Sequence, residues 1–199
     1  MTEFINRLIF LIAATTFFFS QPIFAQTLNE LERDCDTGRA LACGLLGDRY
    51  RHGDVVQQNK SKAAAYYQKS CDGGVALACS NLGMFFDSGE GVRQDKFKAV
   101  ELYQKGCDGG SAVGCSNLGV MFSDGDGVRQ DKFKAFELHQ KGCEGGSGLG
   151  CANLGIMYFN GEGVRQDKSR ALNLFGKACD LRNQSGCENY AKLKNSGVK

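Results

Sequence analysis

Histidine is scarce in this sequence, which contains only His52 and His139. Neither belongs to an H-E-x-x-H motif, and the acidic loop at 124–131 does not have the ligand spacing of a calcium loop. The sequence therefore predicts no metal site and no cofactor. Stretches of one charge sign are also missing, because 24 basic and 22 acidic residues are interspersed. Without a basic stripe, no nucleic-acid partner is expected.

Long apolar runs are missing too, apart from residues 8–19 near the N-terminus. This run is shorter than the roughly 20 residues that cross a bilayer as a helix. It follows Arg7 and precedes a small-residue site ending at Ala25, a pattern typical of a secretory signal peptide. We expect residues 1–25 to be removed, leaving a secreted or periplasmic chain without a transmembrane segment. An uncleaved membrane anchor is the alternative.

Cysteine, in contrast, is abundant and regularly placed. The ten cysteines form two series with a spacing of 36 residues, and each member of the second series lies eight residues after one of the first. The series are Cys35, Cys71, Cys107, Cys143 and Cys179, and Cys43, Cys79, Cys115, Cys151 and Cys187. A fixed period of this length indicates a repeat protein.

Each 36-residue unit contains two segments with helical periodicity. Apolar residues recur at i, i+3 or i+4, and i+7 in helix A near 75–87 and in helix B near 96–107. The linking GEGVRQD segment has two glycines that end the first helix, and Asp95 can cap the second. The sequence therefore predicts an all-α solenoid of about five helix pairs with short terminal caps, forming one domain over residues 26–199.

The cysteine spacing predicts where the chain reverses. In one continuous helix, residues eight apart are separated by about 12 Å, which exceeds the limit of about 7 Å between the Cα atoms of a disulfide. In the three central units a glycine pair lies between the cysteines, and glycine permits a left-handed helix end. We therefore predict five local disulfides, Cys35–Cys43, Cys71–Cys79, Cys107–Cys115, Cys143–Cys151 and Cys179–Cys187. Free thiols, the alternative, conflict with export to an oxidising compartment.

The units share the motif NLG-x-M-[FY]-x-x-G-x-GV-x-Q-D-x-x-[KR]-A-x-x-L. With its added C-x7-C, this motif resembles the SEL-one-like repeat family, and in particular its secreted branch, the Helicobacter-type cysteine-rich proteins. The resemblance extends from about Thr27 to the C-terminus. It implies a right-handed superhelix of αα-hairpins that acts as a scaffold for protein partners. It also implies a penicillin-binding or β-lactamase activity, which several members are described as having.

The motifs of serine β-lactamases do not support that activity. S-D-N and K-T-G are absent, and S-x-x-K occurs only from Ser196 to Lys199, in the C-terminal tail. His139 takes the place of Tyr103 and Phe175 in sister units, which favours a packing role. If the protein is an enzyme, the sequence predicts a β-lactamase-type hydrolase and leaves its catalytic residues unidentified.

The candidates for a ligand groove lie on the A helices. Asparagine recurs at one position and forms a ladder, and its amide can both donate and accept hydrogen bonds to a peptide backbone. An internal hydrogen bond between neighbouring units is the alternative. Positions at which the units differ can make the groove selective for one ligand over another. The candidates are Asn81, Asn117, Asn153 and Asn189 from the ladder, and Met84, Asp87, Ser123 and Phe159 from the variable positions.

Together these features predict an exported, disulfide-stapled, monomeric binding scaffold. Its concave groove would recognise a peptide, a protein, or a small molecule derived from the cell wall, such as a peptidoglycan fragment or a β-lactam. A weak penicillin-binding protein or β-lactamase is the alternative that the resemblance implies. A structural protein of the cell envelope is the third reading.

Overall fold

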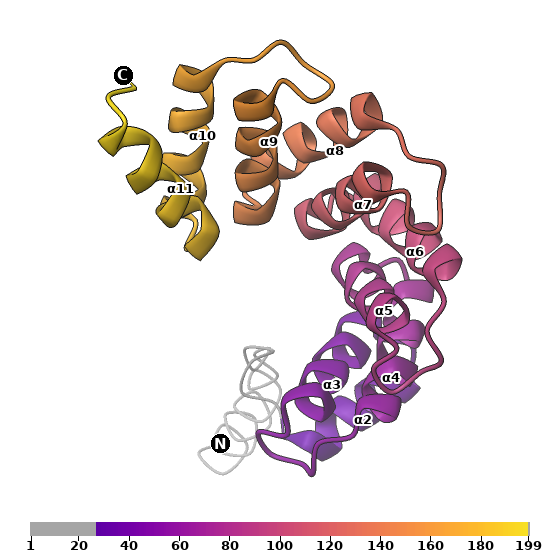
Figure 1. Cartoon of the computed structure of the whole chain (residues 1–199). Coiled ribbons are helices and arrows are strands. Elements are labelled where there is room, and N and C mark those ends of the chain that lie inside the picture. The colour runs from indigo at the N-terminus through magenta and orange to yellow at the C-terminus, as the bar shows by residue number, and fades with distance from the viewer. Residues whose placement is uncertain (1–26, 199) are drawn as a thin grey trace, which may run out of the picture.

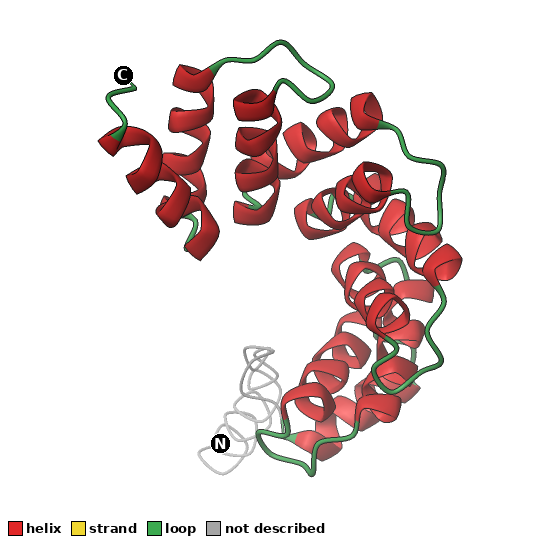
Figure 2. Cartoon of the chain, in the orientation of Figure 1, coloured by secondary structure: helices red, strands yellow, loops and turns green. Residues whose placement is uncertain are grey.

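The structure is a computed structural model that describes residues 27–198, so the expected signal peptide and its cleavage site near Ala25 lie outside the described residues. Within 27–198 the chain forms ten helices and no strand, arranged as one open arc (Figures 1 and 2). The helices are α2 (Leu28–Asp36), α3 (Ala40–His52), α4 (Lys60–Asp72), α5 (Ala76–Ser88), α6 (Lys96–Asp108), α7 (Ala112–Asp124), α8 (Lys132–Glu144), α9 (Gly148–Asn160), α10 (Lys168–Asp180) and α11 (Gln184–Asn195). The predicted all-α solenoid is confirmed.

The odd-numbered helices α3 to α11 are the A helices, and α4, α6, α8 and α10 are the B helices. Each of these B helices packs between two A helices, while α5, α7, α9 and α11 also contact one another in sequence. In Figure 1 the A helices lie on the inner side of the arc and the B helices on its outer side. The concave face of the solenoid is therefore made by the A helices.

The helix boundaries follow from local side-chain chemistry. The Asp95 side chain accepts a hydrogen bond from the backbone N–H of Lys98 at 3.0 Å, which caps α6, and Asn59 caps α4 in the same way. The A helices α3, α5, α7 and α9 end at glycines in the left-handed region, such as Gly89 with φ 76°, whereas α11 ends at Ser196. Both kinds of boundary are confirmed at the positions expected from the sequence.

The turn from helix B to the next helix A differs in detail from the prediction. Only the second glycine of each pair is left-handed: Gly73 has φ −77°, whereas Gly74 has φ 89°. Gly73 is needed for another reason, because a Cβ atom there would collide with the Cβ of Ala40. In the last unit, which has no glycine at this turn, Arg182 takes the left-handed conformation with φ 60°.

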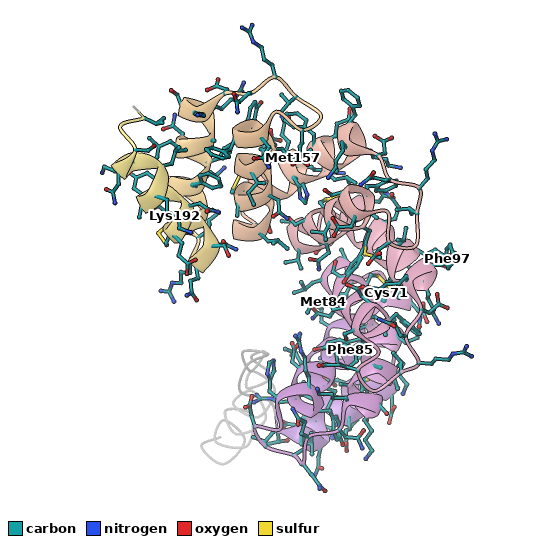
Figure 3. The ribbon with its side chains drawn as sticks, in the orientation of Figure 1. Cys71, Met84, Phe85, Phe97, Met157 and Lys192 are labelled. Atoms are coloured by element: carbon teal, nitrogen blue, oxygen red, sulfur yellow. A yellow bond between two sulfur atoms is a disulfide. The ribbon has the colours of Figure 1, made fainter. Side chains whose placement is uncertain are left out.

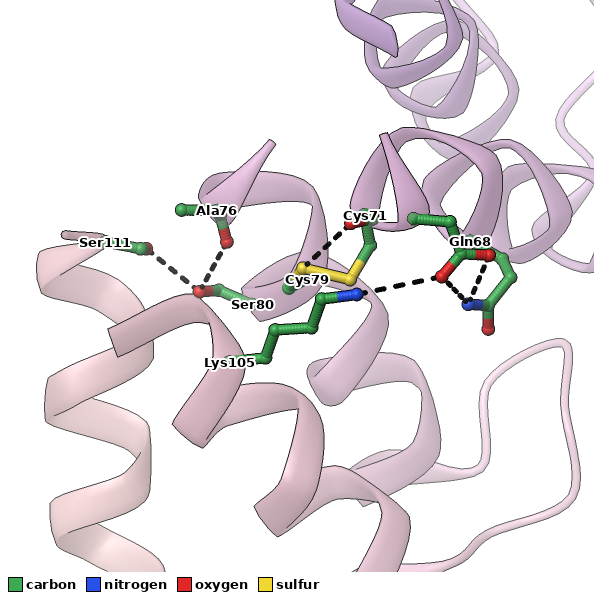
Figure 4. Close-up of a disulfide and its surroundings, with 8 residues drawn as sticks. Gln68, Cys71, Ala76, Cys79, Ser80, Lys105 and Ser111 are labelled. Atoms are coloured by element: carbon green, nitrogen blue, oxygen red, sulfur yellow. Dashed lines mark hydrogen bonds and ion pairs between the residues drawn. A yellow bond between two sulfur atoms is a disulfide. The ribbon is translucent and has the colours of Figure 1, made fainter. Parts of the chain in front are cut away.

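The five predicted disulfides are all present, with Cα–Cα distances of 4.4 to 4.8 Å. Cys71 lies in the last turn of α4 and Cys79 in the first turns of α5, so the bridge joins two helices across the reversal (Figure 4). Beside it, the buried Ser80 Oγ lies 2.9 Å from Ser111 Oγ, at the junction with the next unit. Each bridge closes a short loop, a constraint worth about 2–3 kcal/mol in the loop-entropy model.

A ring packed on a glycine recurs between helices A and B of every unit. A Cβ atom at Gly83 would lie 2.7 Å from the Tyr103 ring, and one at Gly119 would lie 2.7 Å from the His139 ring. The four pairs are Gly47–Tyr67, Gly83–Tyr103, Gly119–His139 and Gly155–Phe175. This close approach explains a mid-helix glycine, which costs roughly 1 kcal/mol relative to alanine. The packing role predicted for His139 is thus confirmed.

None of the helices between residues 27 and 198 has the length and apolar character needed to span a bilayer.

Candidate functional site

Four hollows follow one another along the inner face of the arc, and each contains one asparagine of the ladder. In chain order these are Asn81, Asn117, Asn153 and Asn189, which define hollows 1 to 4. Each hollow lies between two successive A helices and is also lined by the B-helix ring that packs on a glycine. These rings are Tyr67, Tyr103, His139 and Phe175. We call the four hollows together the concave groove.

The variable candidates also line the groove. Met84 and Asp87 line hollow 2, Ser123 lines hollow 3 and Phe159 lines hollow 4. In Figure 3, Met84 lies on the inner side of the arc, whereas Phe97 projects from its outer side. The structure thus brings the eight sequence candidates onto one continuous face.

The ladder asparagines are half-buried. Within residues 27–198, their four side chains have no hydrogen-bonding partner, so the internal hydrogen bond considered from the sequence is not formed there. These amides keep contact with water, because none of their atoms is among the buried polar atoms without a partner. Each amide can therefore hydrogen-bond to solvent or to an external group.

Hollow 1 is mainly apolar. Leu41 and Leu77 line it and are 56% and 53% exposed. The Tyr67 hydroxyl donates a hydrogen bond to Asp48 Oδ1 at 2.6 Å. Burial and this bond to the carboxylate raise the pKa of Tyr67. The hollow offers an apolar wall beside the amide of Asn81.

Hollow 2 is built around a satisfied carboxylate. Asp87 accepts a hydrogen bond from Lys96 Nζ at 2.5 Å and another from the Tyr103 hydroxyl at 3.3 Å. Lys96 also lies 3.3 Å from Asp126 of the next loop. Burial and the Asp87 carboxylate raise the pKa of Tyr103. The lysine, the tyrosine and two carboxylates therefore form one network at this site.

Hollow 3 has a different polar set. Lys132 Nζ donates to Ser123 Oγ at 3.0 Å and to Glu162 Oε2 at 2.9 Å. His139 is only 2% exposed, and its Nδ1 has no hydrogen-bonding partner. Burial, together with the Lys132 ammonium, lowers the pKa of His139 to about 4. The imidazole is therefore neutral near pH 7.

Hollow 4 combines cations with aromatic rings. Lys168 Nζ lies 5.7 Å from the centre of the Phe159 ring, a cation–π arrangement. Lys192 and Asn189 stand on α11, and Phe175 lies on α10. Along the groove, the lining thus changes from apolar through acidic and mixed polar to cationic, while the asparagine stays constant.

Sequence reasoning missed the part of the groove that comes from the B helices and the A-to-B loops. The missed contributors are the loop residue Glu162 and the lysine that begins each B helix: Lys168 lines hollow 4, and Lys132 contacts Ser123 and Glu162 of hollow 3. A lysine at the first position of all four B helices is visible in the sequence. The eight sequence candidates all lie on A helices, because helix periodicity alone does not indicate which loop and B-helix residues face the groove.

Ser196 and His52, which bear on the catalytic alternatives, both lie at helix ends. Ser196 donates from its hydroxyl to the backbone oxygen of Leu193 at 2.7 Å, at the end of α11. His52 is exposed at the end of α3. Among residues 27–198, no group of three or more His, Cys, Asp or Glu side chains is placed to hold a metal ion.

This architecture, a curved stack of αα-hairpins with a lined concave groove, defines the chain as an α-solenoid. The Sel1 repeat matches it at residues 40–75, 76–111, 112–147 and 148–183, which together make up more than half of the chain. The chain belongs to the Sel1 repeat family. Each match comprises one A helix and the B helix that follows it, so α2 and α11 flank four complete repeats.

Solved structures of three Sel1-type proteins are similar to this chain. Helicobacter pylori cysteine rich protein B is 31% identical, with a TM-score of 0.53, over 68% of this chain and 98% of its own. A protective antigen of uropathogenic Escherichia coli strains displaying an SLR fold is 29% identical, with a TM-score of 0.76, over 86% of this chain. A Sel1 repeat protein from Oxalobacter formigenes is 25% identical, with a TM-score of 0.69, over 82% of this chain and 68% of its own.

The chain covers only 37% of the length of the Escherichia coli antigen. No match was found among curated proteins. The family match and the similar solved structures establish that the chain is a Sel1-repeat scaffold, and the five disulfides make it disulfide-rich.

Proposed function

We propose that this protein is an exported scaffold whose concave groove binds an extended peptide segment of a partner protein. The observation that carries the proposal is the ladder of half-buried asparagine amides, one in each hollow, with no partner within residues 27–198. Packed helices are about 8–10 Å apart, and an extended peptide advances about 3.3 Å per residue. Each unit therefore corresponds to about three peptide residues, so the amides can meet backbone groups at a regular interval.

Export is supported by the disulfides and by the N-terminal sequence. Five bridges require an oxidising compartment to form and persist. Residues 1–25 have the pattern of a cleaved signal peptide. We infer a periplasmic or secreted location for the mature chain, acting as a monomer.

A selection experiment tests the peptide-binding proposal. Oxidised protein comprising residues 26–199 is used to select from a random peptide library displayed on phage, and the enriched peptides are synthesised for affinity measurement. In the double variant Asn117→Ala/Asn153→Ala, we expect affinity to fall at least tenfold, because each lost hydrogen bond costs about 1 kcal/mol. The matched control is Asn173→Ala on the exposed surface of α10, outside the four hollows, and it should bind normally. Equal affinity of the double variant and the native protein would refute the proposal.

The β-lactamase alternative is not favoured by the groove. Ser123 of hollow 3 does contact a lysine, but the Lys132 ammonium donates to both Ser123 Oγ and the Glu162 carboxylate. An ammonium group cannot accept the proton of a serine nucleophile. We expect a chromogenic β-lactam to show no turnover above that of the same preparation reduced and alkylated. Turnover that depends on intact disulfides would contradict this assignment.

A further inference from the structure

Hollows 2 and 3 are built from the same four positions of the repeat. In hollow 2 these positions hold Asp87, Lys96, Tyr103 and Asp126, and 36 residues later they hold Ser123, Lys132, His139 and Glu162. The two sites differ in that the neighbours Asp87 and Ser88 become Ser123 and the exposed Asp124, and the tyrosine is replaced by a shorter imidazole. The first site therefore serves as an internal template for the second.

In the template, one lysine is shared between two carboxylates. Lys96 contacts Asp87 and Asp126, and the Tyr103 hydroxyl completes the surroundings of Asp87. In hollow 3 the contact equivalent to Asp126 is retained, because Lys132 pairs with Glu162 at 2.9 Å. The contact equivalent to Asp87 is reduced to a hydroxyl, since Lys132 reaches only Ser123 Oγ on that side. Lys132 therefore pairs with one carboxylate, whereas Lys96 pairs with two.

The other donors at this place also lack acceptors. The amide of Asn153 has no partner within residues 27–198. The His139 ring rests its Nδ1 edge against Gly119, where Nδ1 has no hydrogen bond. A buried N–H without an acceptor is rarer in proteins than an unpaired acceptor, which favours the proton on Nε2, at the opposite edge of the ring. The ring lines hollow 3 and can therefore supply an N–H donor there.

We propose that hollow 3 is a subsite for a carboxylate group of the bound peptide, which takes the place that the Asp87 side chain fills in hollow 2. Lys132, Ser123, Asn153 and His139 supply the donors. The inference rests on the peptide-binding function proposed above. The carboxylate is either the C-terminus of the peptide or an acidic side chain, which share the same recognition chemistry.

Nuclear magnetic resonance of the histidine rings provides the test. Only two histidines are present, and exposed His52 serves as an internal reference for His139. The probes are N-acetyl-trialanine with a free carboxylate, the same peptide with a C-terminal amide, and an amidated peptide with a central aspartate. A free carboxylate at either place should give a saturable shift of the His139 ring signals, and the fully amidated trialanine should not. The two acidic probes identify which source of carboxylate the subsite takes.

Two reciprocal variants sharpen the test. Ser123→Asp rebuilds the intramolecular carboxylate, so it should lower the affinity for the acidic probe at least tenfold. Asp87→Ser should open a second site, detected as a new saturable shift of the Met84 methyl signal in hollow 2. Ser169→Asp, on the exposed start of α10, adds the same charge outside the hollows and should leave binding unchanged. Circular dichroism of each variant confirms that it is folded.

The outcomes separate this inference from the proposed function. If the amidated trialanine shifts His139 as strongly as the acid, or if folded Ser123→Asp binds the acid normally, the carboxylate subsite is wrong. If library peptides bind through the asparagine ladder whether or not they carry a carboxylate, the subsite fails and the groove function stands. If the acidic probe binds hollow 3 while library peptides ignore the ladder, the groove function fails and the subsite stands.

Discussion

Buried His139 should make the stability of the protein fall in mild acid, and the substitution His139→Phe should remove that dependence. Phenylalanine fits because Phe175 holds the same position against Gly155 in the next unit. The pKa of His139 is about 4 in the folded protein, against its ordinary value of 6.5. The unfolded chain therefore binds a proton below pH 6.5 that the folded chain does not bind until about pH 4. The contribution of the neutral imidazole to the free energy of unfolding is fully present above pH 6.5, and it is lost as the pH falls from 6.5 to about 4.

The magnitude follows from linkage. At 1.36 kcal/mol per pKa unit, the difference between the pKa values of His139 in the unfolded and folded chain lowers the free energy of unfolding by about 3 kcal/mol between pH 7 and pH 4. Urea unfolding of the oxidised protein at pH 7, 5 and 4 measures it, and subtracting the His139→Phe curve removes the contribution of carboxylates common to both proteins. His52→Gln, at an exposed site, should follow the native curve. If the native protein and His139→Phe lose the same stability between pH 7 and pH 4, the reasoning about the buried imidazole is refuted.

Two further predictions concern the stack itself. Gly83→Ala should destabilise the protein by about 1–3 kcal/mol through overpacking, since the new Cβ would lie 2.7 Å from the Tyr103 ring, whereas alanine normally stabilises a helix. Gly176→Ala, whose nearest contact would be 3.3 Å, should be close to neutral in the same urea titration; equal effects would contradict the ring-on-glycine explanation. Replacing Cys107 and Cys115 together by serine should lower the free energy of unfolding by about 2–3 kcal/mol without loss of helical circular dichroism. An unchanged urea midpoint would show that this disulfide does not contribute to the stability of the fold.

The sequence predicted the features that depend on local chemistry. The helix pairs, the Asp95 cap and the five disulfides follow from residues that are close together in the sequence, because periodicity, capping and short-range reversal do not require knowledge of the superhelix. The same locality explains the error at the B-to-A turn. There Gly73 is required by contact with Ala40, which begins the other helix of the same pair, and such a contact between packed helices is not visible in the local sequence of the turn.

The composition of the groove was predictable only in part. The asparagine ladder could be found because one residue recurs at a fixed period. Hollow 3, however, combines Ser123 of α7, Lys132 at the start of α8 and Glu162 from the loop after α9. Bringing these residues together depends on how each unit is rotated against the next, which periodicity does not specify.

The central claim is that a peptide lies along the ladder. The most direct measurement is the nitrogen–proton spectrum of the asparagine side-chain amides, recorded with a peptide selected from the library. The account predicts saturable shifts for Asn81, Asn117, Asn153 and Asn189, or for a consecutive subset if the peptide is short, with Asn173 unchanged. A bound peptide that leaves all four ladder amides unshifted would contradict it.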